Sequence, residues 1–271
     1  MTLMLAALLG LVIGSFLNVV IHRLPKQLAY DWALQCGQTP SEPRLGLAWP
    51  GSHCPACGHR LRWFENVPVL SFIVQRGRCR ACAGAIRWRY PVLEVAAAAL
   101  AVWAVAQFGL HGQAVAAMVF LWALLALAVI DLETMLLPDR LTLGLLWLGL
   151  LLNLDGTFAP VSVPLSEAVW GAVAGYGSLA GVAWAYARLA GREGLGLGDA
   201  KLLAALGAWL GWTVLPLLVL LASVMALIVG LAAMLLGRAD RHTALPFGPF
   251  LALAGVAALF WGEQWIGLWL R

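Results

Sequence analysis

Charged side chains are scarce in this sequence, and their scarcity decides its class. Only 11% of the 271 residues are Asp, Glu, Lys or Arg, whereas soluble domains carry about 25%. Hydrophobic residues make up 62% of the chain, which exceeds the roughly 45–50% of a soluble domain. This composition excludes an ordinary soluble enzyme and predicts a protein that crosses a membrane several times.

The apolar segments lack the alternation of polar and apolar residues that marks membrane β-strands, which argues against a β-barrel. Most of them approach the roughly 20 residues that an α-helix needs to cross a bilayer. The sequence therefore predicts an all-α polytopic membrane protein with about eight transmembrane helices. The predicted spans are residues 1–21, 91–108, 113–131, 136–153, 167–189, 200–214, 216–237 and 246–269.

Lys and Arg are absent from the first span, 1–21, and from the turns 109–112 and 154–166. Residues 22–90, in contrast, contain ten of the 17 Lys and Arg residues. Because cytoplasmic loops carry an excess of Lys and Arg, we expect block 22–90 in the cytoplasm and the N-terminus outside. This orientation places sixteen of the 17 basic residues inside, and it makes the first span an uncleaved helix rather than a secretory signal.

Cysteine is also rare, and four of the five cysteines form two C-x-x-C pairs. Cys54 and Cys57 precede Cys79 and Cys82 at a spacing that is typical of four-thiolate zinc sites. Disulfides are not maintained in the cytoplasm, so we expect a small zinc-knuckle-like domain within 22–90. Four thiolates fill the coordination sphere of zinc, which favours a structural role. The alternative is a set of redox-active or merely buried thiols.

Two carboxylates stand where apolar segments end. Asp131 closes the apolar run 118–130. An ionised Asp within a bilayer costs about 2.5–3.5 kcal/mol, so such residues usually face a wet cavity or a partner. The alternative for Asp131 is a helix end that meets water. Asp139 follows Pro138 and is expected to cap the next helix.

Asp199 follows a run of alternating glycines, Gly194, Gly196 and Gly198. Glycine lacks Cβ and therefore permits an open backbone and the close approach of another segment. The alternative role of Asp199 is to cap the helix that begins near Ala200. A nucleotide-binding loop is excluded, because neither a strand nor a βαβ unit surrounds these glycines, and we expect no nucleic-acid partner.

Asp131 and Asp199 fall on the same, cytoplasmic, side of the predicted topology. When two carboxyl groups approach closely, one retains a proton while the other stays charged. The charged group takes a proton from water, and the protonated group polarises a peptide carbonyl. The sequence thus permits aspartic peptide hydrolysis at the membrane surface.

Six short motifs follow one another along nearly the whole chain. They are residues 14–25, 54–82, 89–91 with Glu94, 130–131 with 137–139, 196–201 and 245–250. In this order they resemble the motifs of the type IV prepilin leader peptidases, which are bifunctional membrane enzymes with N-methyltransferase activity.

The resemblance implies that Asp131 and Asp199 are the catalytic pair, that Asp139 is not catalytic, and that 91–271 forms the membrane aspartic peptidase domain. It places Gly196, Gly198 and Lys201 in the loop that supports the second aspartate. It implies cleavage of a short basic leader from prepilins and pseudopilins, just after a glycine, at the cytoplasmic face of the bacterial inner membrane. S-adenosylmethionine is implied as the donor that methylates the new N-terminal amine, and no residue is assigned to it.

Two other functions are compatible with the residues. One is a peptidase without methyltransferase activity, whose cysteine domain serves assembly or substrate docking. The other is a zinc-binding membrane transporter or channel that uses its membrane carboxylates for ions or protons. Both acids lie at one face and no acid marks the centre of a span, which disfavours transport. A purely structural scaffold leaves the paired acids and the glycine run unexplained.

Overall fold

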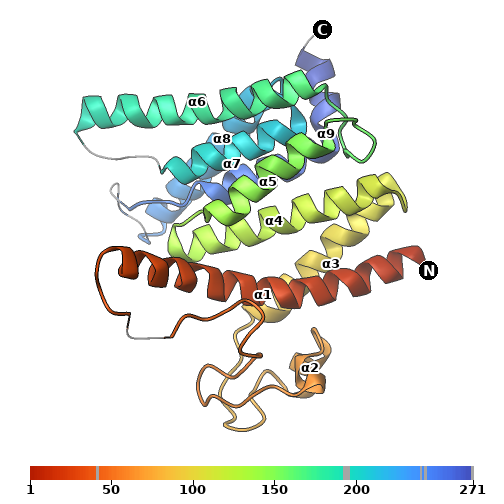
Figure 1. Cartoon of the computed structure of the whole chain (residues 1–271), viewed down its shortest axis with the longest axis vertical. Helices are drawn as coiled ribbons and strands as arrows, with labels where there is room; N and C mark the ends of the chain where they lie inside the picture. The colour runs from red at the N-terminus through yellow and green to blue at the C-terminus, as the bar shows by residue number, and fades with distance from the viewer. Residues whose placement is uncertain (41–42, 192–195, 239, 241–242, 270–271) are drawn as a thin grey trace. The chain divides into compact units, whose positions relative to one another are not determined.

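Helices dominate the structure, a computed structural model that describes residues 1–40, 43–191, 196–238, 240 and 243–269 (Figure 1). Within these ranges the chain forms isolated β-bridges but no β-strand. The long helices are α1 (Thr2–Gln35), α3 (Arg89–Phe108), α4 (Gly112–Thr134), α5 (Asp139–Leu152), α6 (Leu165–Ala190), α7 (Leu197–Leu210), α8 (Leu215–Leu235) and α9 (Gly248–Trp269). Between α1 and α3 lie a 3-10 helix (Trp63–Asn66) and the short α2 (Leu70–Val74).

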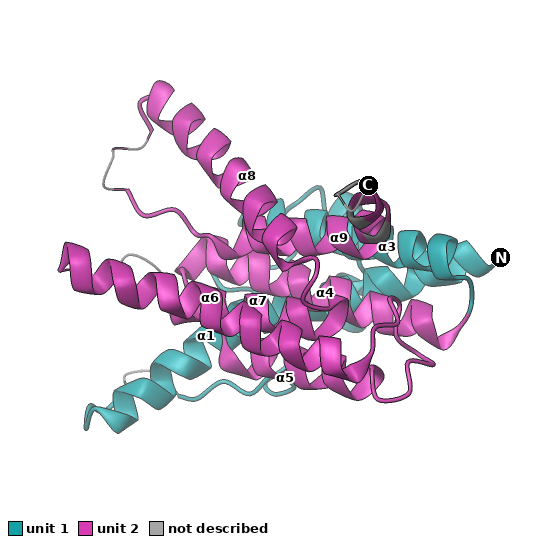
Figure 2. Ribbon diagram, turned by 90° about the horizontal axis from the view of Figure 1, so that it is seen from above, with its two compact units in different colours: residues 1–110 teal, residues 111–271 magenta. Residues whose placement is uncertain are grey.

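The chain divides into two compact units, residues 1–110 and 111–271 (Figure 2). Unit 1 contains the helix pair α1 and α3 together with the cysteine-bearing segment between them, which we call the cysteine lobe (residues 51–88). Unit 2 contains α4 to α9. The three-part division expected from the sequence, 1–21, 22–90 and 91–271, concerns position relative to the membrane and stays a prediction.

The structure confirms the all-α, multi-spanning architecture. Each predicted span after the first coincides with one long helix, and the ends differ by a few residues. Among the described residues, five helices, α1, α3, α4, α6 and α8, are long and apolar enough to cross a membrane. The two 14-residue helices, α5 and α7, reach about 21 Å at 1.5 Å per residue, which is less than the hydrocarbon thickness.

α1 extends further than the predicted span 1–21. It continues to Gln35 and accommodates Pro25 within the helix. The loop that follows covers this extension, because the buried guanidinium of Arg23 donates hydrogen bonds to the carbonyls of Gly46 at 2.8 Å and Gly51 at 3.3 Å. A polar side chain thereby stabilises a helical turn that the apolar pattern does not mark.

α7 is the most buried helix of unit 2. From Asp199 to Leu210 every residue except Lys201 is buried, as expected for a helix that is apolar on all sides. Glycines allow α6 to approach it closely: a Cβ atom at Gly171 would lie 2.3 Å from the carbonyl oxygen of Gly207. On another side, Trp209 donates a 2.7 Å hydrogen bond to the carbonyl of Leu145 in α5.

The buried residues of α8 lie near its beginning. They are Leu215, Leu218 and Ala222, and the helix then diverges from α7 and α9 (Figure 2). Large side chains such as Leu227 and Ile228 remain about 60% exposed. An exposed apolar helix of this kind is suited to a lipid environment.

Candidate active site and cysteine cluster

Asp131 is buried at the C-terminal end of α4, with only 5% of its surface exposed. The helix ends one turn later at Met135, which adopts a left-handed conformation and donates its N–H to the Asp131 carbonyl at 2.8 Å. The side chain therefore does not simply meet water at a helix end. It projects into unit 2 from the last turn of α4.

The carboxylate of Asp131 is held by the first residue of α9. Gly248 donates its backbone N–H to Asp131 Oδ2 at 2.9 Å. The N-terminal N–H groups of a helix have no partner within the helix, and the helix dipole favours a negative charge at this position. The start of α9 therefore stabilises Asp131 in its charged form.

Asp199 lies in the first turn of α7 and is 8% exposed. It does not cap this helix, since the N-cap residue is Gly196 and no side chain donates or accepts a capping hydrogen bond. Within the described chain, Asp199 Oδ1 is buried and has no hydrogen-bond partner. A buried carboxyl oxygen without a partner is costly, which points to an occupant such as water or a substrate carbonyl.

The segments that carry the two aspartates meet in unit 2. Asp131 is close enough to Asp199 for their charges to interact. Leu137 lies between the segments that carry them: a Cβ atom at Gly198 would lie 2.9 Å from Leu137 Cβ, and one at Gly248 would lie 3.2 Å from Leu137 Cδ2. The ends of α4, α7 and α9 thus converge around this leucine.

The supporting loop predicted around the second aspartate is partly described. Gly196 and Gly198 flank the start of α7, and Gly198 allows the close contact with Leu137. Lys201 forms an ion pair with Asp139 at 2.6 Å. Gly194, the first of the predicted glycines, lies outside the described residues.

The prediction that Asp139 caps the next helix is wrong. Pro138 is the N-cap residue of α5, and Asp139 is the first residue of the helix. Its two carboxylate oxygens accept hydrogen bonds from Lys201 Nζ at 2.6 and 2.8 Å, so the charge is used to join α5 to α7. Its side chain is 56% exposed, unlike the two buried aspartates.

The four cysteines of the two C-x-x-C pairs come together in the cysteine lobe. Their sulfur atoms all lie within 4.8 Å of one another. Cys54 Sγ lies 3.9 Å from Cys82 Sγ, and Cys57 Sγ lies 4.0 Å from Cys79 Sγ. A tetrahedral zinc ion with Zn–S bonds near 2.3 Å separates its sulfur ligands by about 3.8 Å. The cluster therefore has the dimensions of a metal site.

Both pairs sit on the same kind of tight turn. Gly58, with a φ of +71°, donates its N–H to the Cys54 carbonyl at 2.9 Å. Ala83 takes the same place after the second pair, with a φ of +56° and a 2.8 Å hydrogen bond to the Cys79 carbonyl. A positive φ is ordinary for a glycine such as Gly58, whereas alanine rarely adopts it, so the sequence carries no signal for the turn at Ala83.

One of the four thiols is prepared for a metal by backbone donors. The N–H groups of Cys82 and Ala81 lower the pKa of the Cys79 thiol to about 6. The backbone N–H of His59 acts on Cys57 in the same direction, but burial and the neighbouring thiols outweigh it and raise the pKa of Cys57 to about 12. The thiolate is the form that binds metals, so the surroundings of Cys79 favour its role as a ligand. Cys36, at the end of α1, is exposed and takes no part in the cluster.

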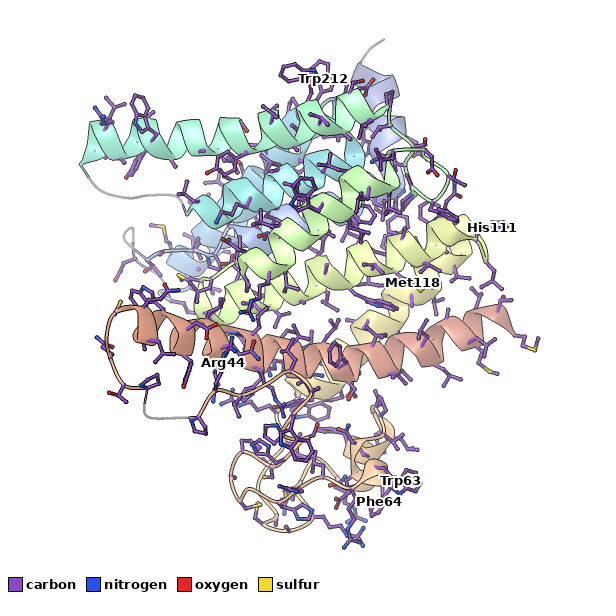
Figure 3. All side chains as sticks on the ribbon, in the orientation of Figure 1. Arg44, Trp63, Phe64, His111, Met118 and Trp212 are labelled. Atoms are coloured by element: carbon purple, nitrogen blue, oxygen red, sulfur yellow. The ribbon has the colours of Figure 1, made fainter. Side chains whose placement is uncertain are left out.

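The cysteine lobe has almost no hydrophobic core. Among residues 51–88 only Glu65 and Cys79 are buried. The aromatic rings of Trp63 and Phe64 lie on the outer side of the lobe, near α2, and Trp63 is 83% exposed (Figure 3). A segment without a core needs a metal or another cross-link to stay folded. A metal ion bound by the cysteine cluster can supply this cross-link.

Comparison with known proteins agrees with this geometry. Residues 8–108 match the model of the bacterial peptidase A24 N-terminal domain, and residues 118–231 match that of the type IV leader peptidase family. A prepilin leader peptidase/N-methyltransferase of Stutzerimonas stutzeri is 47% identical over 96% of this chain and 90% of its own length. The chain belongs to the type IV leader peptidase family.

Other relatives in this family have the same name. The prepilin leader peptidase/N-methyltransferase of Burkholderia pseudomallei is 52% identical over 97% of this chain and 86% of its own length. That of Pseudomonas aeruginosa is 47% identical over 95% of this chain and 89% of its own length. No solved structure matches the chain.

Two residues lie beside the aspartates, and the sequence alone assigned no role to either of them. Gly248 lies in the motif 245–250 and holds Asp131, and Leu137 packs between the glycines at the starts of α7 and α9. The sequence signal for Gly248 is a glycine at the first position of a helix. Glycine has no Cβ atom and so permits a contact that any side chain would block.

Proposed function

We propose that this chain is a prepilin leader peptidase and N-methyltransferase, which removes the short basic leader of prepilins and pseudopilins and methylates the new N-terminal amine. One observation carries the peptidase assignment: two buried carboxyl groups, Asp131 and Asp199, interact within one site, and an oxygen of one of them has no partner in the described chain. The family and the names of its members support both activities.

The contacts of the two aspartates suggest different starting roles. Asp131 accepts the N–H of Gly248 at a helix N-terminus, which favours the charged form and the role of general base. Asp199 has no such donor to its Oδ1, which favours the protonated form and the role of general acid. Two adjacent carboxyl groups that share one proton satisfy both roles.

With Asp131 as the general base and Asp199 as the general acid, the reaction has two steps. Asp131 takes a proton from water while the water oxygen forms a bond to the scissile carbonyl carbon, and Asp199 gives its proton to the carbonyl oxygen. In the second step Asp131 returns its proton to the leaving nitrogen and the carbon–nitrogen bond breaks. Asp199 recovers a proton from the hydroxyl group that becomes the new carboxyl, so the pair ends as it began.

The supporting loop keeps α7 in place rather than entering the chemistry. Gly198 allows Leu137 to lie against the first turn of α7. Lys201 is bound to Asp139 and so ties α7 to the start of α5. We assign Gly196, Gly198 and Lys201 to positioning of Asp199.

We place the N-terminus outside and residues 22–90 in the cytoplasm of a bacterial inner membrane. The distribution of the 17 basic residues supports this orientation, since sixteen of them then fall on the inner side. The site of cleavage would lie at the cytoplasmic face, where a charged leader stays in water while the apolar helix of the substrate remains in lipid.

We assign the four-cysteine cluster to a structural zinc ion held by Cys54, Cys57, Cys79 and Cys82. The sulfur spacing and the turn geometry fit such an ion. Four thiolates leave no open position for a substrate, so the ion would stabilise the fold of the cysteine lobe.

The deciding experiment measures cleavage of a prepilin-like substrate by purified protein in vesicles. Asp131→Asn and Asp199→Asn should each lower the rate by about 10²–10⁴-fold, which is the usual contribution of general acid–base catalysis. Asp155→Asn provides a matched control, because this exposed residue lies in a turn and accepts the N–H of Thr157 as its one hydrogen bond within the described chain. Normal cleavage by either site variant would refute the assignment.

The same preparation separates the alternatives. Methyl groups from labelled S-adenosylmethionine should appear on the cleaved substrate, and their absence alongside normal cleavage would leave a peptidase only. Ion flux in vesicles without any cleavage by the wild type would favour a transporter.

A further inference from the structure

A second buried polar site lies in unit 1, between α1 and α3. These helices run antiparallel and approach closely through two glycines: a Cβ atom at Gly10 would lie 2.5 Å from Ala98 Cα, and one at Gly14 would lie 2.6 Å from Glu94 Cα. One turn further along, Asn18 donates a hydrogen bond to the carbonyl of Tyr90 at 3.2 Å. The tightly packed pair therefore carries polar side chains on its inner face.

Glu94 is a buried carboxylate without a cation. It is 7% exposed, and its Oε2 accepts the backbone N–H of Val69 at 2.7 Å. The hydroxyl of Ser15 lies near enough to the carboxyl group to interact with it. No Lys, Arg or His in the described part of the chain pairs with it. A buried carboxyl group without a positive neighbour favours its neutral form, and a cation that enters the site would favour the charged form.

The side-chain amide of Asn18 adds a hydrogen-bond acceptor to this site. It is 3% exposed, and its Nδ2 donates to the carbonyls of Gly14 and Tyr90, both at 3.2 Å. Its Oδ1 has no hydrogen-bond partner among the described residues. Ser15 and Asn18 are three positions apart on one helix and so share a face, which places the carboxylate and the amide oxygen in one cluster.

The segment that covers Glu94 is strained. Val69 has a φ of +60° and a ψ of −47°, and the N–H of Leu70 bonds to the carbonyl of Pro68 at 2.5 Å. This is the rare form of the γ-turn, and it is unfavourable for a β-branched residue. Release of the Val69 N–H from Glu94 would relieve the backbone and free a carboxylate oxygen at the same time.

From these contacts we propose that Ser15, Asn18 and Glu94 form the cation-binding centre of methyl transfer, with the Val69 N–H occupying the place that the ligand would take. This proposal rests on the proposed function. The ligand is an organic cation: the ammonium group of the new N-terminus, or the sulfonium group of the methyl donor. Both need acceptors of negative or partial negative charge, which Glu94 and Asn18 supply.

The chemistry of methyl transfer explains why the site needs such acceptors. The terminal ammonium loses one proton to Glu94 or to water and becomes an amine. The nitrogen lone pair then forms a bond to the methyl carbon, while the carbon–sulfur bond breaks and its electrons stay on sulfur. The product is a secondary ammonium and a neutral thioether, so charge and atoms balance.

Glu94 has a second possible role, as an anchor for Val69 only. Glu94→Gln distinguishes the roles, because the amide oxygen still accepts the Val69 N–H while the negative charge is lost. Asn18→Leu is a second test, since leucine fills a similar volume without the free oxygen. Glu167→Gln in α6 is the matched control, since it makes the same chemical change in unit 2.

The experiment uses the full-length protein in detergent with a prepilin-like substrate and with the same substrate already cleaved. We expect Glu94→Gln to cleave normally and to methylate the cleaved substrate about 10–100-fold more slowly, which corresponds to the loss of a charged hydrogen bond. Asn18→Leu should show the same split. A wild type that neither cleaves nor methylates would refute the proposed function itself.

Binding measurements supply a readout apart from activity and identify the cation. If the site holds the sulfonium, Glu94→Gln should abolish the preference for S-adenosylmethionine over its neutral demethylated analogue. If it holds the ammonium, the variant should instead abolish the preference for a free N-terminus over an acetylated one. Unchanged methylation and unchanged preferences, or loss of cleavage together with methylation, would overturn the proposal.

Discussion

The backbone N–H of Gly248 donates a 2.9 Å hydrogen bond to Asp131 Oδ2, although 117 positions separate the two residues. The contact joins the end of α4 to the start of α9. It requires glycine, because a Cβ atom at Gly248 would lie 2.7 Å from the same carboxylate oxygen. The motif 245–250 thus contributes to the site through the backbone rather than through a side chain.

Gly248→Ala should therefore inactivate the peptidase without unfolding it. The added methyl group must displace the Asp131 carboxylate or the start of α9, and a shift of about 1 Å in a catalytic group costs on the order of 10²-fold in rate. Cleavage of a prepilin-like substrate measures the effect, and the thermal unfolding midpoint reports on the fold. Gly181→Ala in α6 is the control, since nothing lies within 4 Å of its Cβ position and activity should be retained. Equal activity of the two variants would contradict the role of Gly248.

Asp139→Asn should retain most of the activity, in contrast to Asp131→Asn. Asp139 is exposed and its partner is Lys201, so the pair is close to a surface ion pair worth at most about 1 kcal/mol. We expect the free energy of unfolding to fall by no more than this, with a few-fold loss of cleavage as α7 loosens from α5. Lys201→Met and the double variant complete a cycle that measures the coupling. A loss of activity as large as that of Asp131→Asn would place Asp139 in the chemistry.

Helix positions in this chain were predictable because long apolar runs have few alternative structures in a membrane. The predicted span 216–237, for example, falls on α8. A continuous apolar segment in lipid forms a helix because a helix satisfies all of its backbone hydrogen bonds within the segment. The extension of α1 beyond residue 21 was not predictable, since it depends on Arg23 binding the carbonyls of a loop more than twenty residues away.

The sequence indicates which residues belong to the candidate site but not which contacts they make. The burial cost of a carboxylate marked Asp131 and Asp199, and the spacing of thiols marked the cysteine cluster. The use of Asp139 as an ion-pair partner, instead of a helix cap, depends on α5 and α7 packing side by side. Such a tertiary contact overrides the local preference of aspartate for helix caps.

Removal of metal should unfold the cysteine lobe before the helices. We expect elemental analysis to find about one zinc ion per chain, and Cys57→Ser or Cys79→Ser to lower that content. Because residues 51–88 have almost no core, a chelator should make the arginines of this lobe accessible to trypsin while α4 to α9 resist. Cys36→Ser is the control and should bind the metal normally, since Cys36 lies outside the cluster. Protein free of metal with an intact, protease-resistant lobe would contradict a structural zinc site.

Glu65 should make the stability of the cysteine lobe depend on pH. The backbone N–H of Arg62, at 2.8 Å, and the ring of His59 hold the pKa of the Glu65 carboxyl below its usual value of 4.5. A lowered pKa in the folded state means that the unfolded lobe binds more protons, so the stabilisation is complete above about pH 4.5 and is lost as the pH falls further. Glu65→Gln should therefore lower the protease resistance of the lobe at pH 7. The difference from wild type should shrink as Glu65 becomes protonated, because the neutral acid resembles the amide. A difference that stays constant down to pH 3 would show that the charge of Glu65 does not stabilise the fold.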